Sequence, residues 1–494
     1  MDTKAPITRA KSLSPVHVGA LALGCIVGWI GFVAPGAEYL PEAGPAGTLL
    51  AIAVAALAMM VFAANYGYMV QRLPVAGGEF AFARSAFGGT HAFVCVWFLG
   101  LAYLCPVALN ATAIGFVARP LFHDTLMVGP HWASAGYEVY LPPLALSVGA
   151  IAFVAALCAR GVRDTGVFQT VLALALGGGA AVVAGALAMQ PSVWAAADPA
   201  LHPAAEGGRS LLPGFFMVLS VAPCLFVGFD TVPQSAEEFA FRPRLARRIM
   251  VGAILAGAAL YAALALVAAS APPPDAGDPE KGIQAFPVFH AAWRLLGGTG
   301  VAFLSYAALA AALTGLVGFF TAASRLLWAM ARAGVLSPWL GRVSAEHRTP
   351  VNAILFVAAV SMAAPLFGRN ALGWLSDLCS LGAAVAYGYT SAAAFRFARR
   401  EGRRGVQATG AAGVALAAVF ALLLVVPLPG LNCAMKPHSW AILAVWAALG
   451  GLLRLARRGG GAVGRRASWR QSPLQSFSPM LACECALSVT SACR

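Results

Sequence analysis

The chain has 494 residues, of which 60% are hydrophobic and only 11% are charged, and its mean hydropathy is +0.78. A soluble chain of this length would form about three domains, and so few charges could not cover their surfaces. Helices that face lipid remove this need, because the hydrocarbon around them is itself apolar. The composition therefore excludes an ordinary soluble protein and predicts an all-α integral membrane protein in contact with a lipid bilayer.

The net charge of +14 does not indicate a nucleic-acid partner, because the basic residues stand in short clusters between apolar segments of membrane-spanning length. The ten cysteines do not indicate a disulfide framework or a metal site. Most are scattered through apolar segments, where free Cys behaves as a small hydrophobe, and those in the C-terminal tail have no His at ligand spacing. We therefore expect no nucleic acid, no metal and no cofactor.

Twelve apolar segments of spanning length follow one another along the chain. They lie near 15–36, 46–70, 91–118, 141–160, 165–188, 211–236, 249–271, 300–330, 349–367, 371–395, 408–430 and 437–456. With twelve transmembrane helices both termini lie on one side, and that side then carries 27 of the 33 Lys and Arg residues. This asymmetry predicts a multi-pass protein of the cell membrane with both termini in the cytoplasm.

Two of the twelve segments contain helix breakers near their middle. The breakers are Gly24, Gly28, Gly31 and Pro35-Gly36 in the first segment, and Pro223, Gly228 and Pro233 in the sixth. Non-helical backbone at this depth occurs only where it lines a cavity or is buried in protein. The first and sixth segments correspond if the chain contains two repeats of five helices, the second inverted because five is odd. Paired breaks at matching places indicate a transporter's substrate site. Alternatively, Gly24 and Gly28 serve only helix packing.

Such breaks suit an amino acid. Free N–H groups at the start of a half-helix bind a carboxylate, and free carbonyls at the end of another bind an ammonium. We expect the carboxylate at the backbone from Ile26 to Gly31, and the ammonium at carbonyls of the sixth segment shared with Ile26 or Val27. The expected substrate-binding residues are Ile26, Val27, Gly28, Trp29, Ile30, Gly31, Cys224, Leu225, Phe226, Val227, Gly228 and Phe229.

Two further predictions concern single side chains. Phe226 or Phe229 would cap the substrate as an aromatic gate, although an aromatic residue in a span usually serves packing. Asp230 is a candidate for coupling to protons or cations, since an intramembrane carboxylate is functional by default. The alternative is that Asp230 only provides hydrogen bonds at the break.

Four segments carry motifs that resemble the amino acid–polyamine–organocation (APC) superfamily of amino acid permeases. They are the Gly-rich first segment, RLPVAGGEF after the second, GFD with AEE and RP at the sixth, and SRLLWAMARAG at the end of the eighth. The resemblance implies a five-plus-five inverted repeat with discontinuous helices 1 and 6, and two peripheral helices. The chain departs from the family pattern at Trp29 and Ile30, where a small hydroxyl residue and Gly are usual, and at Phe80, where Tyr is usual.

This division predicts five regions. They are a cytoplasmic segment at 1–14, a first repeat at 15–188, a second repeat at 211–395, helices 11 and 12 at 408–456, and a disordered basic tail at 457–494. The expected function is alternating-access transport of amino acids or amines; an amino-acid-sensing membrane receptor with little flux is the alternative. An enzyme is not expected, because the eight His lie at span ends or in loops. The sequence leaves the oligomeric state open.

The fifth segment bears on energy coupling. Some proton-coupled relatives carry a lysine there, and the resemblance places that position at about Leu176. The run from Val171 to Met189 contains no ionisable residue. We therefore expect an antiporter or facilitated carrier rather than symport through such a lysine.

Overall fold

The computed structural model describes residues 13–75, 77–134, 137–161, 168–172, 174–179, 185, 189, 191, 211–270, 286–344, 346–347, 349–368 and 370–459. The expected cytoplasmic segment at 1–14 and tail at 457–494 lie almost entirely outside these residues, and so does much of the fifth segment at 165–188.

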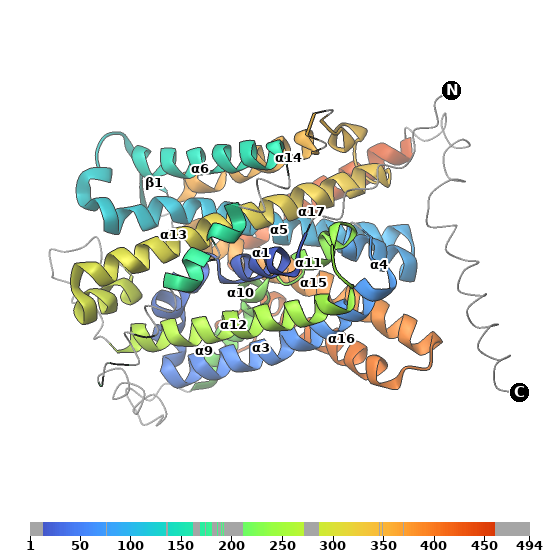
Figure 1. Ribbon diagram of the computed structural model, residues 1–494, viewed down its shortest axis with the longest axis horizontal. Coiled ribbons are helices and arrows are strands. Elements are labelled where there is room, and N and C mark those ends of the chain that lie inside the picture. Colours follow the sequence, from blue (N-terminus) through green and yellow to red (C-terminus); the bar gives the residue numbers. More distant parts are fainter. Residues whose placement is uncertain are drawn as a thin grey trace, which may run out of the picture. The chain divides into compact units, whose positions relative to one another are not determined.

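The described chain is mostly helical (Figure 1). The first half comprises α1 (Pro15–Val27), α2 (Ile30–Ala34), η1 (Pro35–Tyr39), α3 (Leu40–Arg72), α4 (Gly78–Phe87), α5 (Gly89–Phe122), η2 (His123–Leu126), β1 (His131–Ser134), β2 (Tyr137–Tyr140) and α6 (Leu141–Arg160). The second half comprises α9 (Leu211–Ser220), α10 (Ala222–Phe226), α11 (Thr231–Gln234), η3 (Ala236–Glu238), α12 (Arg244–Ala269), α13 (Pro287–Arg332), η4 (Pro338–Gly341), α14 (Val351–Ser361), η5 (Ala364–Phe367), α15 (Asn370–Arg400), α16 (Arg404–Val425) and α17 (Pro437–Gly459). The strands form one antiparallel hairpin, which the sequence analysis did not predict.

Eight helices among the described residues are long and apolar enough to cross a membrane. They are Pro15–Ala34, Leu40–Arg72, Gly89–Ala118, Leu141–Arg160, Arg244–Ala269, Pro287–Arg332, Ala371–Arg400 and Arg404–Val425. Each coincides with a span expected from the sequence. Val351–Phe367 is apolar but shorter, and the sixth segment is divided among α9, α10 and α11. The count of twelve spans and the inverted repeat therefore stay predictions.

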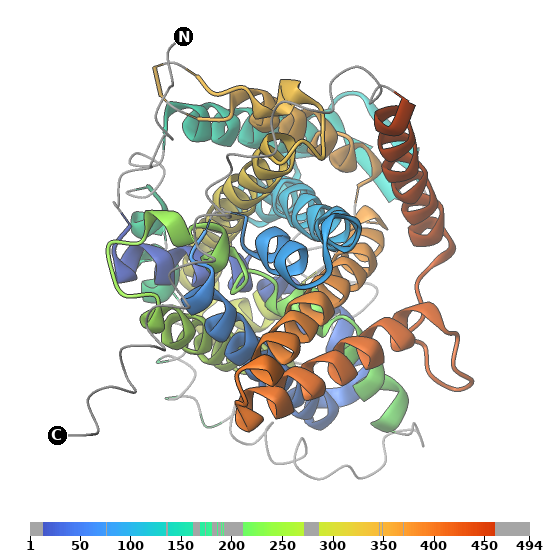
Figure 2. The ribbon, with the colours of Figure 1, turned by 90° about the vertical axis from the view of Figure 1, so that its right-hand side faces the viewer.

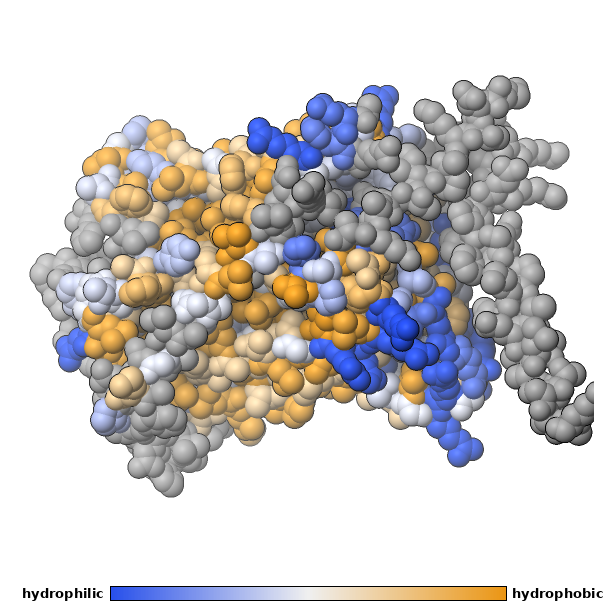
Figure 3. All heavy atoms as spheres, in the orientation of Figure 1, coloured by the Kyte–Doolittle hydropathy of each residue, from blue (hydrophilic) through white to orange (hydrophobic). Residues whose placement is uncertain are grey.

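Polar and apolar surface separate as a membrane requires. Figure 3 shows an apolar region across the middle of the visible face and hydrophilic residues gathered towards the end where α4 and α16 lie in Figure 1. We call this the basic end, because Arg72, Arg244 and Arg403 lie at the ends of spans there. Side chains such as Leu57 and Leu255 are exposed by 59% and 50% midway along their helices, as expected for contact with lipid.

Some spans are interior and others are peripheral. In the most apolar stretch of each helix, 83% of the residues of α5 and 72% of those of α13 and α15 are buried. The corresponding shares are 28% in α6 and 33% in α16. Figure 2 shows α15 and α16, drawn in orange, packed side by side. The short helix α1 contacts α12 and α13, and α10 contacts α15. The interrupted helices are thus surrounded by the long spans.

Candidate functional site

The first span breaks at Gly28. Helix α1 ends at Val27, Gly28 adopts a φ of +41°, and α2 begins at Ile30. An L side chain rarely adopts such a φ, so glycine forms the break itself. Gly24 differs, because a Cβ there would lie 1.7 Å from Cγ2 of Thr314. Gly24 therefore serves helix packing, as the alternative interpretation predicted, whereas Gly28 interrupts the helix.

The sixth span breaks between Phe226 and Thr231, where Gly228 has a φ of +131°. The Gly228 amide donates to Oδ1 of Asp230 at 2.7 Å, and the Thr231 hydroxyl donates to the Gly228 carbonyl at 2.6 Å. Asp230 thus makes a hydrogen bond at the break, as the structural alternative to a coupling role predicted. Its coupling role stays a prediction.

The two breaks are in direct contact. A Cβ built on Gly228 would lie 2.5 Å from Cβ of Cys25 and 2.7 Å from the amide nitrogen of Ile26. Only a residue without a side chain allows the backbones to approach this closely. The pairing of breaks inferred from the sequence is therefore a physical contact in the fold.

Tyr261 of α12 contacts one backbone carbonyl from each of the two breaks. Its fully buried hydroxyl hydrogen-bonds to the carbonyl of Leu225, 2.8 Å away, and to the carbonyl of Ile26. A hydroxyl has one proton, so it donates to only one of these carbonyls at a time. Both carbonyls were expected to bind a substrate ammonium. The sequence analysis did not find Tyr261, because nothing local relates it to the breaks.

Asn110 of α5 provides a hydrogen-bond acceptor for the backbone just before α2, the second half of the first span. Its Oδ1 accepts a hydrogen bond from the Trp29 amide at 3.0 Å, and its Nδ2 donates to the Pro106 carbonyl at 2.8 Å. The amide oxygen thus accepts from a backbone N–H in the stretch from Ile26 to Gly31 that was expected to bind a substrate carboxylate. Asn110 was also missed, although a lone amide in an apolar span is a signal that could have found it.

A cavity of about 20 Å³ lies between the breaks. It is lined by Cys25, Ile26, Gly28, Trp29, Ile30, Pro106, Leu109, Asn110, Cys224, Val227 and Phe319. Six of the twelve expected binding residues are among them: Ile26, Gly28, Trp29, Ile30, Cys224 and Val227. This volume holds about one water molecule, so an amino acid fits only if the breaks move apart.

The other six expected residues do not line this cavity. Val27 and Gly228 are at the breaks, Leu225 contributes its carbonyl to Tyr261, and Gly31 packs against the Tyr261 ring. Phe226 makes an edge contact with Tyr261, and Phe229 packs against Tyr66 and Tyr387. The aromatic gate stays a prediction.

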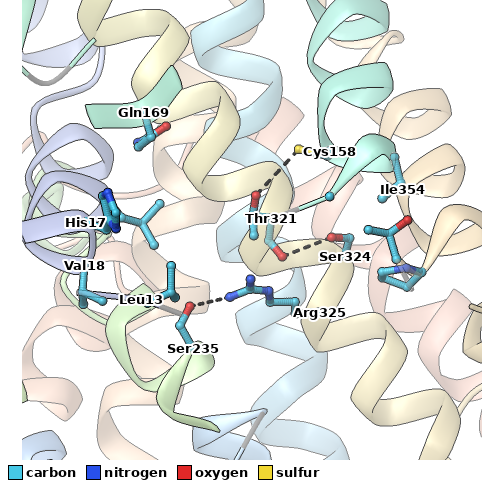
Figure 4. Close-up of a pocket in the computed structure, with 14 residues that line it drawn as sticks. Leu13, His17, Val18, Cys158, Gln169, Ser235, Thr321, Ser324, Arg325 and Ile354 are labelled. Carbon is cyan, nitrogen blue, oxygen red and sulfur yellow. Dashed lines mark hydrogen bonds between the residues drawn. The ribbon is translucent and has the colours of Figure 1, made fainter. Parts of the chain in front are cut away.

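A second cavity, of about 60 Å³, is lined by residues of α1, α6, α13 and α14 (Figure 4). At its floor the Arg325 guanidinium donates to Glu238 at 3.0 Å and to the Ser235 hydroxyl. Both charged side chains are buried, at 5% and 4% exposure. Arg325 of α13 thus reaches Glu238 from inside the bundle.

Helix α4 supports the sixth-span break. Gln234 donates a side-chain hydrogen bond to Glu79, which is fully buried. Burial raises the pKa of the Glu79 carboxyl well above its usual value, because the charged form loses its hydration. The glycines before Glu79 allow this contact, since a Cβ on Gly78 would lie 2.9 Å from Cβ of Pro233.

Comparison with known sequences identifies the family. A sequence model described as "Amino acid permease" matches residues 13–452. The chain belongs to this amino acid permease family. This confirms the resemblance stated from the motifs. The permease is a multi-pass membrane protein, and members of its family are transporters rather than enzymes.

Curated relatives of the permease share about a quarter of their residues with it. The branched-chain amino acid permease BcaP of Lactococcus lactis subsp. cremoris (strain MG1363) is 27% identical over 404 residues, covering 79% of this chain and 82% of the relative. The methylthioribose transporter of Bacillus subtilis (strain 168) is 25% identical, covering 76% and 79%. Cationic amino acid transporter 1 of Arabidopsis thaliana is 25% identical, covering 73% and 58%. The relatives thus support transport of amino acids or related compounds.

Proposed function

We propose that the permease is a secondary transporter that moves amino acids by alternating access, with the substrate bound at the breaks of the first and sixth spans. The observation that carries this proposal is the meeting of the Ile26 and Leu225 carbonyls at Tyr261, beside the Trp29 amide held by Asn110. These groups offer acceptors for an ammonium and a donor for a carboxylate without any charged side chain.

The lining of the cavity favours an uncharged, apolar substrate side chain. None of the described residues that line it is charged, and Asn110 is the polar side chain among them. A cationic side chain in this apolar surrounding would need a carboxylate partner. Of the substrates named for the relatives, a branched-chain amino acid therefore fits better than a cationic one.

The proposed architecture is twelve spans in a five-plus-five inverted repeat with two peripheral helices. Both termini and the basic end lie on the cytoplasmic side of the cell membrane, as the positive-inside rule predicts. Single cysteines introduced at 272–296 should then react with an impermeant thiol reagent in intact cells, and those at 240–247 should not. Labelling of 240–247 from outside would overturn this topology.

The central experiment combines binding and flux. Purified permease is screened by thermal shift against leucine, arginine and putrescine, and uptake of each radiolabelled compound is then measured in proteoliposomes. We expect leucine to bind and to be transported. Binding without flux would instead support an amino-acid-sensing receptor, and failure of all three compounds to bind would overturn the proposed site.

A further inference from the structure

A basic groove lies at the basic end, away from the helix breaks. It has a volume of about 830 Å³ and runs between α3, α12 and α16. The six arginines that line it are Arg72, Arg242, Arg244, Arg247, Arg248 and Arg403. The buried ion pair of Arg325 with Glu238 is separate from it, since neither residue lines the groove.

The charges of the groove are mostly uncompensated. Glu401 pairs with Arg72 and Arg403. In the part of the chain that the structure describes, the other four arginines of the groove make no ion pair, and their side chains are exposed. Arginine does not deprotonate in proteins, so an anion is what relieves their mutual repulsion.

The groove lies where spans enter the membrane. Arg72 is the last residue of α3 and Arg244 the first of α12, and both helices are candidate spans. Ala64 also lines the groove, eight residues before Arg72, which is about 12 Å along a helix. The groove therefore extends from the ends of two candidate spans about two helical turns along α3 towards the middle of that span.

The arginines are also held in place by packing. Gly67 of α3 lies against the stem of Arg247, since a Cβ on Gly67 would be 2.5 Å from Cβ of that arginine. The absence of a side chain on Gly67 lets α12 approach α3 closely, so the arginine stem lies along the wall of the groove.

We propose that this groove binds the phosphate headgroup of an anionic phospholipid, with the start of its acyl chains against the apolar wall at Ala64. Phosphate is the ligand chemistry that clustered guanidinium groups recognise. A lipid, rather than a soluble phosphate, accounts for the apolar depth of the groove. Basic pockets between spans at the cytoplasmic side are a recognised way of binding such headgroups.

The test uses the purified full-length permease and native mass spectrometry, which counts bound lipids. The probes are phosphatidylglycerol, phosphatidylcholine with the same acyl chains, and inorganic phosphate as competitor. We expect phosphatidylglycerol to bind more tightly than phosphatidylcholine, and more weakly as ammonium acetate is raised, because ions screen the contact. These measurements need no variant.

The decisive comparison uses two double variants with equal loss of charge. Arg244→Gln with Arg248→Gln should weaken phosphatidylglycerol binding roughly 30-fold, about fivefold for each arginine removed. Arg399→Gln with Arg400→Gln, at exposed positions at the end of α15, should leave binding within about twofold. Equal losses in both variants, or displacement of the lipid by an equal concentration of inorganic phosphate, would overturn the proposal. Neither outcome depends on whether the permease transports amino acids.

Discussion

The Tyr261 hydroxyl lies 2.8 Å from the Leu225 carbonyl and also contacts the Ile26 carbonyl, so one side chain of α12 links the two interrupted spans. In the proposed function these carbonyls bind the substrate ammonium. In this conformation the protein itself supplies a partner for them. An ammonium, with three donors, can serve both carbonyls at once, whereas the hydroxyl cannot.

Tyr261→Phe should therefore tighten substrate binding. The change removes the one hydrogen bond that the hydroxyl donates to these carbonyls, and a buried acceptor left without it costs about 1–3 kcal/mol. The variant should melt at a lower temperature, and its substrate-induced thermal shift should be larger than that of the unmodified permease. Tyr306→Phe, at a tyrosine of α13 that is 59% exposed, is the matched control. Weaker substrate binding by Tyr261→Phe would show instead that the hydroxyl is itself a substrate ligand.

Asn110→Asp should discriminate amino acids from amines. The change is nearly isosteric, but a carboxylate beside the Trp29 amide would repel a substrate carboxylate. We expect the Kd for leucine to rise, and to rise further with pH as the introduced carboxyl ionises. The Kd for isoamylamine, which has the leucine side chain but no carboxylate, should not rise. An equal rise in Kd for both compounds would show that the substrate carboxylate does not bind at this position.

Gly28→Val and Gly228→Val should abolish uptake while the permease still reaches the membrane. Both glycines have positive φ, and a side chain on Gly228 would collide with the backbone of the first span. Gly252→Val is the control, because a Cβ at that position of α12 meets no atom within 4 Å. Uptake by radiolabel and surface amount by blotting are measured together. Normal uptake by both break variants would place the substrate elsewhere.

Features that depend on local backbone conformation could be predicted from the sequence, whereas contacts between residues far apart in the chain could not. The breaks could be predicted because Gly28 and Gly228 act through their own backbone conformation. Tyr261 could not be placed, because it contacts Ile26 across 235 positions of the chain, and only the packing of α12 against α1 brings them together. For the same reason Arg325 could not be assigned to Glu238 in advance.

Trp29→Ser should broaden the range of substrates. The Trp29 ring stacks on Phe116 at 6.4 Å and meets Phe286 edge-on at 5.9 Å, so it fills the wall of the cavity. Serine is much smaller and supplies the hydroxyl usual in the family at this place. We expect larger apolar amino acids such as phenylalanine to compete with leucine uptake more strongly than before. Unchanged competition across a panel of amino acids would show that Trp29 does not determine substrate size.

The permease should carry out exchange or facilitated transport rather than proton symport through a lysine of the fifth span. Leu176 stands at about the position where that lysine is expected, and it is buried at 1% exposure. The Leu176 side chain carries no titratable proton. The arginines that precede this span cannot deprotonate usefully.

Proteoliposomes test this mode of transport directly. Leucine inside the vesicles should accelerate uptake of labelled leucine, and an inward proton gradient alone should not cause accumulation. The contacts made by Tyr261 and Asn110 give a reason within the proposed cycle, because hydrogen bonds that stabilise the breaks without substrate would slow the return of an empty carrier. Tyr261→Phe should therefore change the ratio of exchange to net uptake, whereas Tyr306→Phe should not. Accumulation driven by protons, with no stimulation by internal leucine, would contradict this mode. Asp230→Asn would then be the first variant to measure, since Oδ2 of Asp230 is buried and has no hydrogen-bond partner among the described residues.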